Sequence, residues 1–390
     1  MKILWVSDPP EAPTAYGQQT ALFLPRLVAS GHEVALLATS SGYVRRLGDG
    51  TVVLPVAGDR HGNSVVREHA RRFGADVVIT LVDPHVLAPG VYAELPWCAW
   101  APLDFETPTR ATLQVLQQAK CVWSPSRHGR DAYLAAGLKN VSWVPHGVDS
   151  SVFDLQDQGP ARDTLGASIG AEIPADAFLA VAVAANRGSP SRKGFYEIFA
   201  AWKEFSSKHD NVFLYLHTEV TGLGGIGEDL RSVADLAGLK TEPVRSVLFP
   251  PQYELVCGML GPEHLAAAYG AADVFLSTAH GEGFGLGAYE AQMCGCSVIL
   301  PDNTAQTEAC ISGQLVDVIP YMPFDGATLW GRPSVEGTVK ELEYALDEKT
   351  HDGPFEAEGR RVSARGLIMP YDIDRVFTEN FLPALAKAIP

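Results

Sequence analysis

Short apolar segments alternate with amphipathic segments along most of the chain, in two successive runs. In the first run the pattern predicts strands near Lys2–Val6, Glu33–Ala38, Val77–Leu81, Trp97–Ala101, Cys121–Ser124 and Val141–Val144. It predicts helices between them, near Gln18–Ser30, Ser64–Phe73, Pro108–Ala119 and Arg127–Ala136. Alternation of this kind is typical of parallel sheets whose strands are joined by crossover helices.

The second run repeats the pattern. It predicts strands near Phe178–Ala184, Val212–His217, Val244–Phe249, Val274–Ser277, Ser297–Leu300 and Leu315–Ile319. Its predicted helices lie near Phe195–Lys208, Gly227–Ala237, Glu263–Gly270, Leu286–Cys294 and Ala305–Ile311, with tail helices near Val335–Leu346 and Ile373–Ile389. The polar stretch from Asp149 to Asp176 separates the two runs and is interpreted as an interdomain connection. We therefore predict an α/β protein with two Rossmann-like domains, residues 1–160 and 161–370, followed by a C-terminal helix in 371–390.

Length and composition agree with this division. A chain of 390 residues exceeds a single typical hydrophobic core, and 46% hydrophobic with 19% charged residues is ordinary for a globular protein. No apolar run approaches the roughly 18 residues of a membrane span, so we expect no stable membrane insertion. The first residues, Met1–Asp8, are typical of a strand rather than of a signal peptide.

The six cysteines are scattered, and Cys294 and Cys296 lack the spacing of a redox or zinc pair. We expect all six to be reduced core thiols of a cytoplasmic protein.

The net charge of −16 is unevenly distributed. Residues 1–150 carry 13 basic and 13 acidic side chains, so the remaining residues, with 17 basic and 33 acidic side chains, hold the whole excess. This acidity argues against nucleic acid as the main partner. The neutral first half would not repel an anionic ligand.

The segment from His280 to Pro301 carries the most specific chemistry in the chain. A predicted strand runs into a bend, and a predicted helix begins near Leu286. The bend is interrupted by three glycines: Gly283, Gly285 and Gly287. Glycines let the backbone approach a ligand closely, and free N–H groups at a helix start attract phosphate or hydroxyl oxygens. Two carboxylates separated by seven residues, Glu282 and Glu290, suit a ligand with both sugar hydroxyls and a diphosphate.

This string resembles the Glu-x7-Glu segment of retaining GT-B glycosyltransferases of the large group 1, mannosyl- or glucosyltransferase-like, family. Shorter segments are similar as well: Gly31–Val34, Ser124–Ser126 and Val144–Asp149. The resemblance implies two Rossmann-like domains whose parallel sheets face a central cleft, with the C-terminal helix crossing back to the first domain. It also implies that residues 1–160 form the acceptor side and that residues 161–370 bind a nucleotide sugar, since ligands bind beyond the carboxyl ends of parallel strands.

By the same resemblance, Glu290 holds the ribose hydroxyls of the donor nucleotide, and Glu282 faces the donor sugar and phosphates. A carboxylate that accepts two neighbouring hydroxyls makes a charge-assisted and geometrically selective contact. The adjoining backbone is expected to bind the donor too, at Gly283, Phe284, Gly285 and Leu286.

A basic loop follows the first predicted strand of the second domain, from Ala185 to Gly194. Cations fixed beside a diphosphate leaving group stabilise the transition state more than the ground state. The family places an arginine and a lysine here; Lys193 matches the lysine, and both Arg187 and Arg192 are available for the arginine. We assign catalytic roles to Glu282, Lys193 and Arg187, and donor binding to Arg192.

The first predicted domain offers further candidates. Its first loop keeps Gly17, where the family directs backbone N–H groups at the donor phosphate, although Ala15 stands where a second glycine is frequent. Many family members also carry a histidine that faces the donor sugar. In this chain the acceptor- or sugar-facing candidates are Asp83, His85 and Asp104.

Two other motifs are interpreted as structural. Gly222–Gly227 matches the dinucleotide-binding fingerprint in form but lacks a convincing acidic partner for a ribose. Asp372 and Asp374 resemble an Asp-x-Asp metal motif, but they start a terminal helix, where Asp is a common N-cap. No cluster has zinc or calcium spacing, so we expect no metal and no obligatory cofactor beyond the nucleotide-diphosphate sugar that serves as donor substrate.

The sequence therefore predicts a retaining, metal-independent glycosyltransferase that transfers a sugar from a nucleotide-diphosphate donor to an acceptor hydroxyl. The resemblance implies that the leaving diphosphate helps to deprotonate the acceptor, so no protein nucleophile is needed. The base (uridine, guanosine or adenosine), the sugar and the oligomeric state stay open. So does the acceptor: a small molecule, lipid, glycan, protein or modified nucleic acid base. The alternatives are a nucleotide-sugar epimerase or hydrolase of the same fold, a non-catalytic nucleotide- or carbohydrate-binding protein, and an oxidoreductase that uses the Gly222–Gly227 loop.

Overall fold

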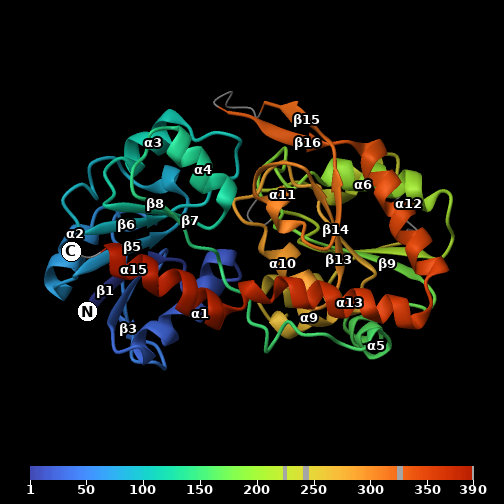
Figure 1. The fold of residues 1–390 in the computed structure, drawn as a ribbon, viewed down its shortest axis with the longest axis horizontal. Coiled ribbons are helices and arrows are strands. Elements are labelled where there is room, and N and C mark those ends of the chain that lie inside the picture. The colour runs from blue at the N-terminus through green and yellow to red at the C-terminus, as the bar shows by residue number, and fades with distance from the viewer. Residues whose placement is uncertain (223–225, 240–245, 323–327, 389–390) are drawn as a thin grey trace. The chain divides into compact units, whose positions relative to one another are not determined.

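The computed structural model describes residues 1–222, 226–239, 246–322 and 328–388 (Figure 1). These residues divide into two units. Unit 1 comprises Met1–Gly147 together with Tyr371–Pro390, and unit 2 comprises Val148–Pro370. Each unit is an α/β body with its own sheet.

Unit 1 is built on a sheet that has eight strands among its described residues, in the order β3-β4-β2-β1-β5-β6-β7-β8. The strands are β1 (Lys2–Ser7), β2 (Glu33–Ala38), β3 (Arg45–Arg46), β4 (Val52–Leu54), β5 (Val77–Leu81), β6 (Trp97–Trp100), β7 (Cys121–Ser124) and β8 (Val141–Trp143). Strand β3 runs antiparallel to β4, and the other neighbours are parallel. Its helices before the interdomain boundary are α1 (Ala15–Ala29), α2 (Val66–Phe73), the 3-10 helix η1 (Pro84–Val86), α3 (Arg110–Leu116) and α4 (Arg127–Ala135).

Helices cover both faces of this sheet, which explains why its strands are almost continuously apolar. Along β1, Ile3 and Trp5 belong to one buried cluster, and Leu4 and Val6 belong to another on the opposite face. The first cluster lies under α1 and the C-terminal helices, and the second lies under α2, α3 and α4 (Figure 1). A strand buried on both faces needs apolar residues at every position rather than at alternate ones.

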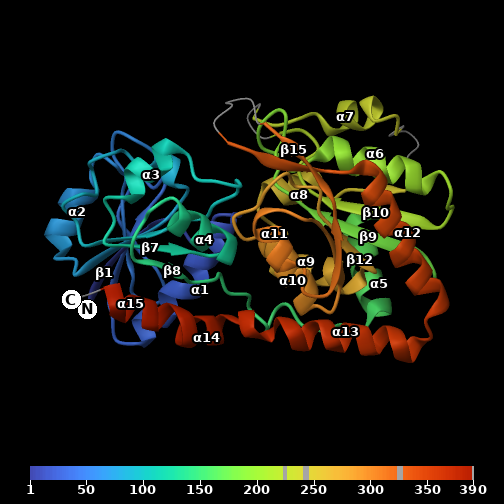
Figure 2. The same cartoon turned by 45° about the horizontal axis from the view of Figure 1, so that its top comes forward.

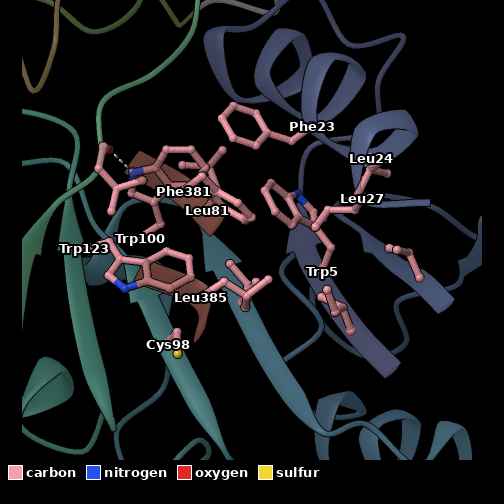
Figure 3. Packing of buried hydrophobic residues seen from close by; sticks show 14 of the residues in the cluster. Trp5, Phe23, Leu24, Leu27, Leu81, Cys98, Trp100, Trp123, Phe381 and Leu385 are labelled. Atoms are coloured by element: carbon pink, nitrogen blue, oxygen red, sulfur yellow. Dashed lines mark hydrogen bonds between the residues drawn. The ribbon is translucent and has the colours of Figure 1, made fainter. Parts of the chain in front are cut away.

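The C-terminal segment completes the first of these clusters. It consists of the 3-10 helix η3 (Met369–Tyr371), α14 (Ile373–Arg375), the π-helical turn η4 (Val376–Phe381) and α15 (Leu382–Ala388). Phe381 lies among aromatic rings of the sheet and of α1, with ring centroids 4.9 Å from Phe23, 5.6 Å from Trp100 and 5.4 Å from Trp123 (Figure 3). The prediction that the tail packs on the first domain is therefore confirmed, although the expected single helix is divided and residue 389 lies outside the described residues.

Unit 2 contains a parallel sheet with six described strands in the order β11-β10-β9-β12-β13-β14. They are β9 (Phe178–Val183), β10 (Val212–His217), β11 (Val247–Leu248), β12 (Val274–Leu276), β13 (Ser297–Pro301) and β14 (Gly313–Val316), and a separate antiparallel hairpin joins β15 (Val318–Tyr321) to β16 (Trp330–Pro333). The helices are α5 (Gln158–Ile169), α6 (Phe195–Ser206), α7 (Leu230–Leu236), α8 (Gln252–Val256), α9 (Pro262–Ala271), α10 (Leu286–Met293), α11 (Thr304–Ala309), α12 (Val335–His351) and α13 (Pro354–Ile368). Helices α6, α7 and α12 share one buried cluster with the sheet (Figure 2).

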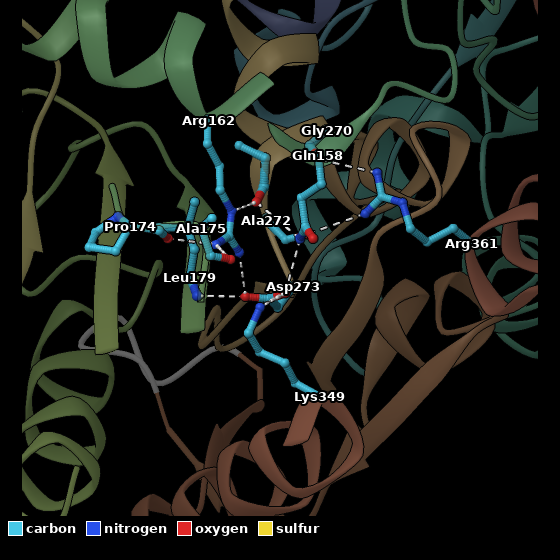
Figure 4. Close-up of polar contacts among 11 residues, drawn as sticks. Gln158, Arg162, Pro174, Ala175, Leu179, Gly270, Ala272, Asp273, Lys349 and Arg361 are labelled. Carbon is cyan, nitrogen blue, oxygen red and sulfur yellow. Dashed lines mark hydrogen bonds and ion pairs between the residues drawn. The ribbon is translucent and has the colours of Figure 1, made fainter. Parts of the chain in front are cut away.

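The first domain boundary differs from the predicted one. It lies at Gly147 rather than at residue 160, and the polar stretch interpreted as a connection contains helix α5. Arg162 of α5 is 3% exposed, and its guanidinium donates to the Ala271 carbonyl at 3.1 Å and pairs with Asp273 at 2.9 Å (Figure 4). Lys349 reaches the other oxygen of the same carboxylate, also at 2.9 Å. This buried ion cluster holds α5 in unit 2, which is why the first boundary lies before α5 and not after residue 160. The second predicted boundary, between residues 370 and 371, coincides with the observed one.

Other predictions are also corrected. The predicted strand Leu315–Ile319 is divided between β14 and β15, α13 was not predicted, and the first residues of the predicted strand Val244–Phe249 lie outside the described residues. All six cysteines fall in the described part of the chain and are free, but Cys257 is exposed, because α8 ends there at the surface, so it is not a core thiol. Among the described residues, no helix is both long enough and apolar enough to cross a membrane.

Candidate functional site

The carboxyl ends of three neighbouring strands in unit 2 surround a pocket of about 290 Å³. The strands are β9, β10 and β12, and side chains from their ends line it, among them Ala182, Leu216 and Leu276. In the sheet, β9 lies between β10 and β12. The strands that follow β9 in the sequence are first added on its β10 side and then on its β12 side, so the strand order reverses at β9. In open parallel sheets, ligands bind at the carboxyl ends of the strands at such a point of reversal.

Three charged residues meet at this pocket. The Glu282 carboxylate forms an ion pair with the Lys193 ammonium through Oε1 and with the Arg192 guanidinium through Oε2, the latter at 3.2 Å. Lys193 and Glu282 both line the pocket. The structure therefore brings together three predicted site residues that are as far as 90 positions apart in the sequence.

Burial and charge act in opposite directions on Glu282, whose side chain is 15% exposed. Burial by itself would raise the pKa of this carboxyl, but Lys193 and Arg192 lower it to about 2. Glu282 is consequently ionised throughout the neutral range and cannot serve as a general acid. It can orient the two cations and accept hydrogen bonds from hydroxyl groups.

Two helices begin beside this cluster, and both have a glycine N-cap. Gly194 precedes α6 with φ +67°, and Gly285 precedes α10 with φ +84°. Neither helix has a side-chain cap, and no other helix among the described residues has a left-handed N-cap. Their first N–H groups are therefore directed out of the helix ends, where the helix dipole favours an anion.

Glycine is required at the start of α6 for a steric reason as well. A Cβ atom at Gly194 would collide with the carbonyl oxygen of Thr278, the residue that follows β12 by two positions. The hydroxyl of Thr278 donates to the Gly194 carbonyl at 2.9 Å. This close approach holds the basic loop against the end of β12.

Glu290 lies in α10 and is 4% exposed. One carboxylate oxygen accepts a hydrogen bond of 3.1 Å from the Tyr269 hydroxyl. The ring of Phe284 stacks on that of Tyr289 with centroids 4.1 Å apart and planes at 3°, which fixes the bend between the two glutamates. Arg365 of α13 donates to the Met293 carbonyl at 2.9 Å and so holds the end of α10.

Residues that follow β13 also fix the bend, and sequence reasoning missed them. The Glu282 N–H donates to the Thr304 hydroxyl at 3.0 Å, and the Ala305 N–H donates to the Glu282 carbonyl at 3.2 Å. The Asn303 amide donates to the His280 carbonyl at 2.7 Å. Thr304 has a φ of +49°, which is rare for a residue with a branched side chain and is the kind of backbone strain found at functional sites.

The two arginines of the basic loop have different partners. Arg192 faces Glu282 and also donates to the Gly281 carbonyl. The Arg187 side chain is 49% exposed and lies 3.4 Å from Glu219. The structure thus places Arg192, rather than Arg187, beside Lys193 and Glu282.

The candidates in unit 1 have different local partners. Gly17 donates its N–H to the Thr14 hydroxyl at 3.0 Å, and a Cβ atom at this position would collide with the Ala12 carbonyl, so the glycine has a structural role in the first turn of α1. Asp83 accepts a hydrogen bond of 2.6 Å from the Tyr16 hydroxyl. His85 lies exposed in η1, and Asp104 is partly buried in the loop after β6.

The motifs interpreted as structural are placed as follows. Residues 223–225 of the Gly222–Gly227 segment lie outside the described residues. Asp372 is the N-cap of α14 and accepts from the Asp374 N–H at 2.9 Å, which confirms the capping interpretation. Within the described ranges, no group of three or more His, Cys, Asp or Glu side chains is arranged to hold a metal ion.

Comparison with known proteins places this geometry in context. No family model matches the chain. A stretch of 191 residues, 47% of the chain, is 31% identical to the D-inositol 3-phosphate glycosyltransferase of Segniliparus rotundus and covers 37% of that protein. The corresponding enzyme of Acidothermus cellulolyticus is 29% identical over 198 residues, 49% of the chain and 39% of the relative. The similarity thus spans less than half the length of these curated relatives.

Solved structures match over nearly the whole chain. A sucrose-phosphate synthase from Thermosynechococcus elongatus has a TM-score of 0.75 at 16% identity and covers 100% of both chains. A glycosyltransferase from Rickettsia africae has a TM-score of 0.71 at 12% identity, over 99% of this chain and 98% of its own. Anabaena HepE in complex with UDP and glucose has a TM-score of 0.70 at 16% identity, over 99% of this chain and 100% of its own. The fold is that of the GT-B glycosyltransferases, and the resemblance inferred from the sequence is confirmed at this level.

Proposed function

We propose that this protein is a retaining glycosyltransferase that transfers a sugar from a nucleotide-diphosphate donor to an acceptor hydroxyl. The observation that carries the proposal is the Lys193–Glu282–Arg192 cluster, which lies where α6 and α10 begin with uncapped N–H groups. The names of the relatives and the GT-B fold support the same class of reaction.

The charges of the cluster fit a diphosphate. Two cations and one carboxylate leave one net positive charge, in a part of the chain that is otherwise strongly acidic. As the bond between sugar and diphosphate breaks, negative charge develops on the leaving group, and Lys193 and Arg192 stabilise it. Glu282 keeps both cations in place and accepts hydrogen bonds from hydroxyls of the donor sugar. The leaving diphosphate then takes the acceptor proton, on the same face of the sugar.

Glu290 is assigned to the ribose. Because Tyr269 already donates to one oxygen of its carboxylate, that carboxylate is held in a fixed orientation in α10. A carboxyl group held in a fixed orientation discriminates a vicinal diol from other groups. Two of the structural neighbours carry UDP or a UDP-sugar in their names, which makes uridine nucleotides the first donors to test.

A same-fold epimerase or hydrolase, or a non-catalytic binding protein, would use the same pocket. Products distinguish these alternatives. A transferase releases nucleoside diphosphate and joins the sugar to an acceptor, whereas a binding protein leaves the nucleotide sugar intact.

The proposal is tested by a thermal-shift screen of UDP-, GDP- and ADP-sugars, followed by calorimetric titration of the free nucleotides. A bound donor raises the free energy of unfolding by mass action, by about 2.7 kcal/mol at a hundredfold excess over Kd, and this raises the melting temperature. Glu290→Gln should weaken the nucleotide and the nucleotide sugar equally, by about 1.5–3 kcal/mol, the value of a hydrogen bond to a charged group. Glu336→Gln, an exposed change in α12, is the matched control. Unchanged nucleotide affinity in folded Glu290→Gln would exclude the ribose assignment, and a wild-type protein that binds none of these nucleotides would exclude the proposed function.

A further inference from the structure

Unit 2 contains a second pocket, of about 400 Å³, that the proposed chemistry does not use. Its lining comes from the basic loop, the start of α6, the segment just before α7, the His280 segment and the β15–β16 hairpin: Pro190, Ser191, Phe195, Tyr196, Glu197, Glu228, His280, Tyr321 and Arg332. As far as the described residues show, Phe195 is the residue that it shares with the pocket at the strand ends. The two pockets are therefore neighbours with different linings.

The hairpin presents one face to this pocket. In its antiparallel register Ile319 pairs with Arg332, and Tyr321 pairs with Trp330. Paired residues, and residues two apart along a strand, point to the same side of a sheet, so these four side chains share a face. The His280 ring lies against it, with its centroid 5.2 Å from that of Tyr321 and 6.3 Å from that of Trp330.

A buried carboxylate forms one wall. Glu197 is 4% exposed; Arg332 contacts its Oε1 through Nε, and His280 Nε2 lies 3.3 Å from its Oε2. Burial would raise the pKa of Glu197, but His280 and Arg332 lower it, so the group is ionised. The buried Nε2 of His280 therefore has the Glu197 carboxylate as a polar neighbour, and the two side chains form one polar wall of the pocket.

Glu228 provides a second carboxyl in the lining. Asn186, which is fully buried, anchors its backbone by accepting from the Glu228 N–H at 2.9 Å and donating to its carbonyl at 2.7 Å. Burial and the nearby Glu197 raise the pKa of Glu228, although the Ser191 backbone opposes this. Two carboxyl groups thus face the same space as Tyr196, Tyr321 and one guanidinium.

This lining selects a class of ligand. A phosphate or another anion would meet two carboxyl groups, and one guanidinium already paired with Glu197 does not offset them. A sugar ring combines C–H faces, which pack on tyrosine rings, with hydroxyls that donate to carboxylates. A few polar groups among aromatic side chains, as in this lining, are typical of small-molecule sites.

We propose that this pocket binds the ring of a neutral sugar or cyclic polyol, separately from the nucleotide. The inference extends the proposed function, because a polyol is a class of molecule that supplies an acceptor hydroxyl. Binding at this pocket nevertheless does not require that the transferase activity exists.

The test is saturation-transfer difference NMR on the whole protein with D-glucose, D-galactose, D-mannose and myo-inositol as separate probes. UDP, GDP and ADP are added together, so that whichever of them binds occupies the nucleotide pocket during the measurement. We expect saturation transfer to at least one probe. Its affinity should fall about tenfold in Glu228→Gln and in Tyr321→Ala, the effect of losing one charge-assisted hydrogen bond or one ring contact.

Three controls keep the result specific. Glu263→Gln and Tyr344→Ala change exposed residues of the same types, and Lys193→Ala disturbs the nucleotide pocket. The probe should bind all three as it binds the wild type, and melting temperatures establish that each variant is folded. Absence of transfer to all four probes, equal binding by the Glu228 and Tyr321 variants, or loss of binding in Lys193→Ala instead would each overturn the proposal. Failure of nucleotides to bind would contradict the proposed function and leave this result intact.

Discussion

Lys193 is the residue on which the proposed chemistry depends most directly. In Lys193→Ala, Glu282 keeps Arg192 as its partner at 3.2 Å, so the carboxylate is not left without a counter-ion. The cluster changes from one net positive charge to none. The variant should therefore fold but lose its attraction for a diphosphate.

The expected magnitude follows from the positions of the charges. Lys193 is 21% exposed and lies next to a helix start, so its field is only partly screened by water. The loss of one charged hydrogen bond should weaken binding of the donor by about 1.5–3 kcal/mol. If Lys193 also stabilises the developing charge on the leaving group, turnover should fall by about 10²–10³-fold, the scale for one lost electrostatic stabiliser.

The assay measures release of nucleoside diphosphate at saturating donor, with the donor taken from the thermal-shift screen. Arg192→Ala and Arg187→Ala are measured in parallel. Arg192→Ala should resemble Lys193→Ala, and Arg187→Ala should have a smaller effect because its side chain is half exposed and paired with Glu219. Lys340→Ala, at a side chain that is 81% exposed, is the control for removal of a surface charge.

Normal turnover of Lys193→Ala at saturating donor would refute the reasoning. A raised Michaelis constant alone would mean that Lys193 binds the ground state and the transition state equally. A larger loss in Arg187→Ala than in Arg192→Ala would show that the basic loop rearranges when the donor binds.

Three further predictions concern stability and metal dependence. Phe381→Ala should destabilise unit 1 by about 3–5 kcal/mol, since it removes a ring buried among aromatic side chains; denaturant titration followed by tryptophan fluorescence measures this, and a loss below about 1 kcal/mol would contradict the packing argument. The pKa of Glu282 falls from its ordinary 4.5 to about 2 in the folded state because Lys193 and Arg192 outweigh burial. The ionised carboxylate therefore contributes stability above pH 4.5 that is lost as the pH falls towards 2, and Glu282→Gln should be less stable than the wild type by up to about 3 kcal/mol at neutral pH, with a gap that narrows below about pH 5. Urea titrations across this range decide it, and a gap that widens on acidification would be incompatible with the ion cluster. Finally, release of nucleoside diphosphate should persist in excess chelator, because the basic loop supplies the positive charge; complete loss that added metal restores would show that a cation is required.

The regular part of the fold is readable from the sequence because both sheets are covered on both faces. Such strands must be apolar at nearly every position, as β1 and β9 are, and this signal survives without any knowledge of the contacts. Helix α5 escaped prediction because its segment is polar. What makes it part of unit 2 is the pairing of Arg162 with Asp273, which is 111 positions away.

The β15–β16 hairpin, like α5, could not be predicted from the sequence. Its two strands are short and lie outside the parallel sheet, so no alternation of strand and helix predicts them. Tyr321 and Arg332 were ordinary loop residues in the sequence. They line one pocket with His280 and Glu197 only because the fold brings these distant segments together.

The sequence by itself determined the two α/β runs and the position of the tail boundary. It also showed which charged groups are available in the Glu282–Glu290 segment and in the basic loop. Each of these features depends on residues that lie close together in the chain. Only the tertiary structure decided which arginine meets Glu282. Arg187 and Arg192 lie in the same short loop with the same charge, and their partners, Glu219 and Glu282, come from the ends of different strands. The physical reason is general: local spacing fixes which groups are available, whereas ion pairing in a partly buried site depends on how distant segments are brought together.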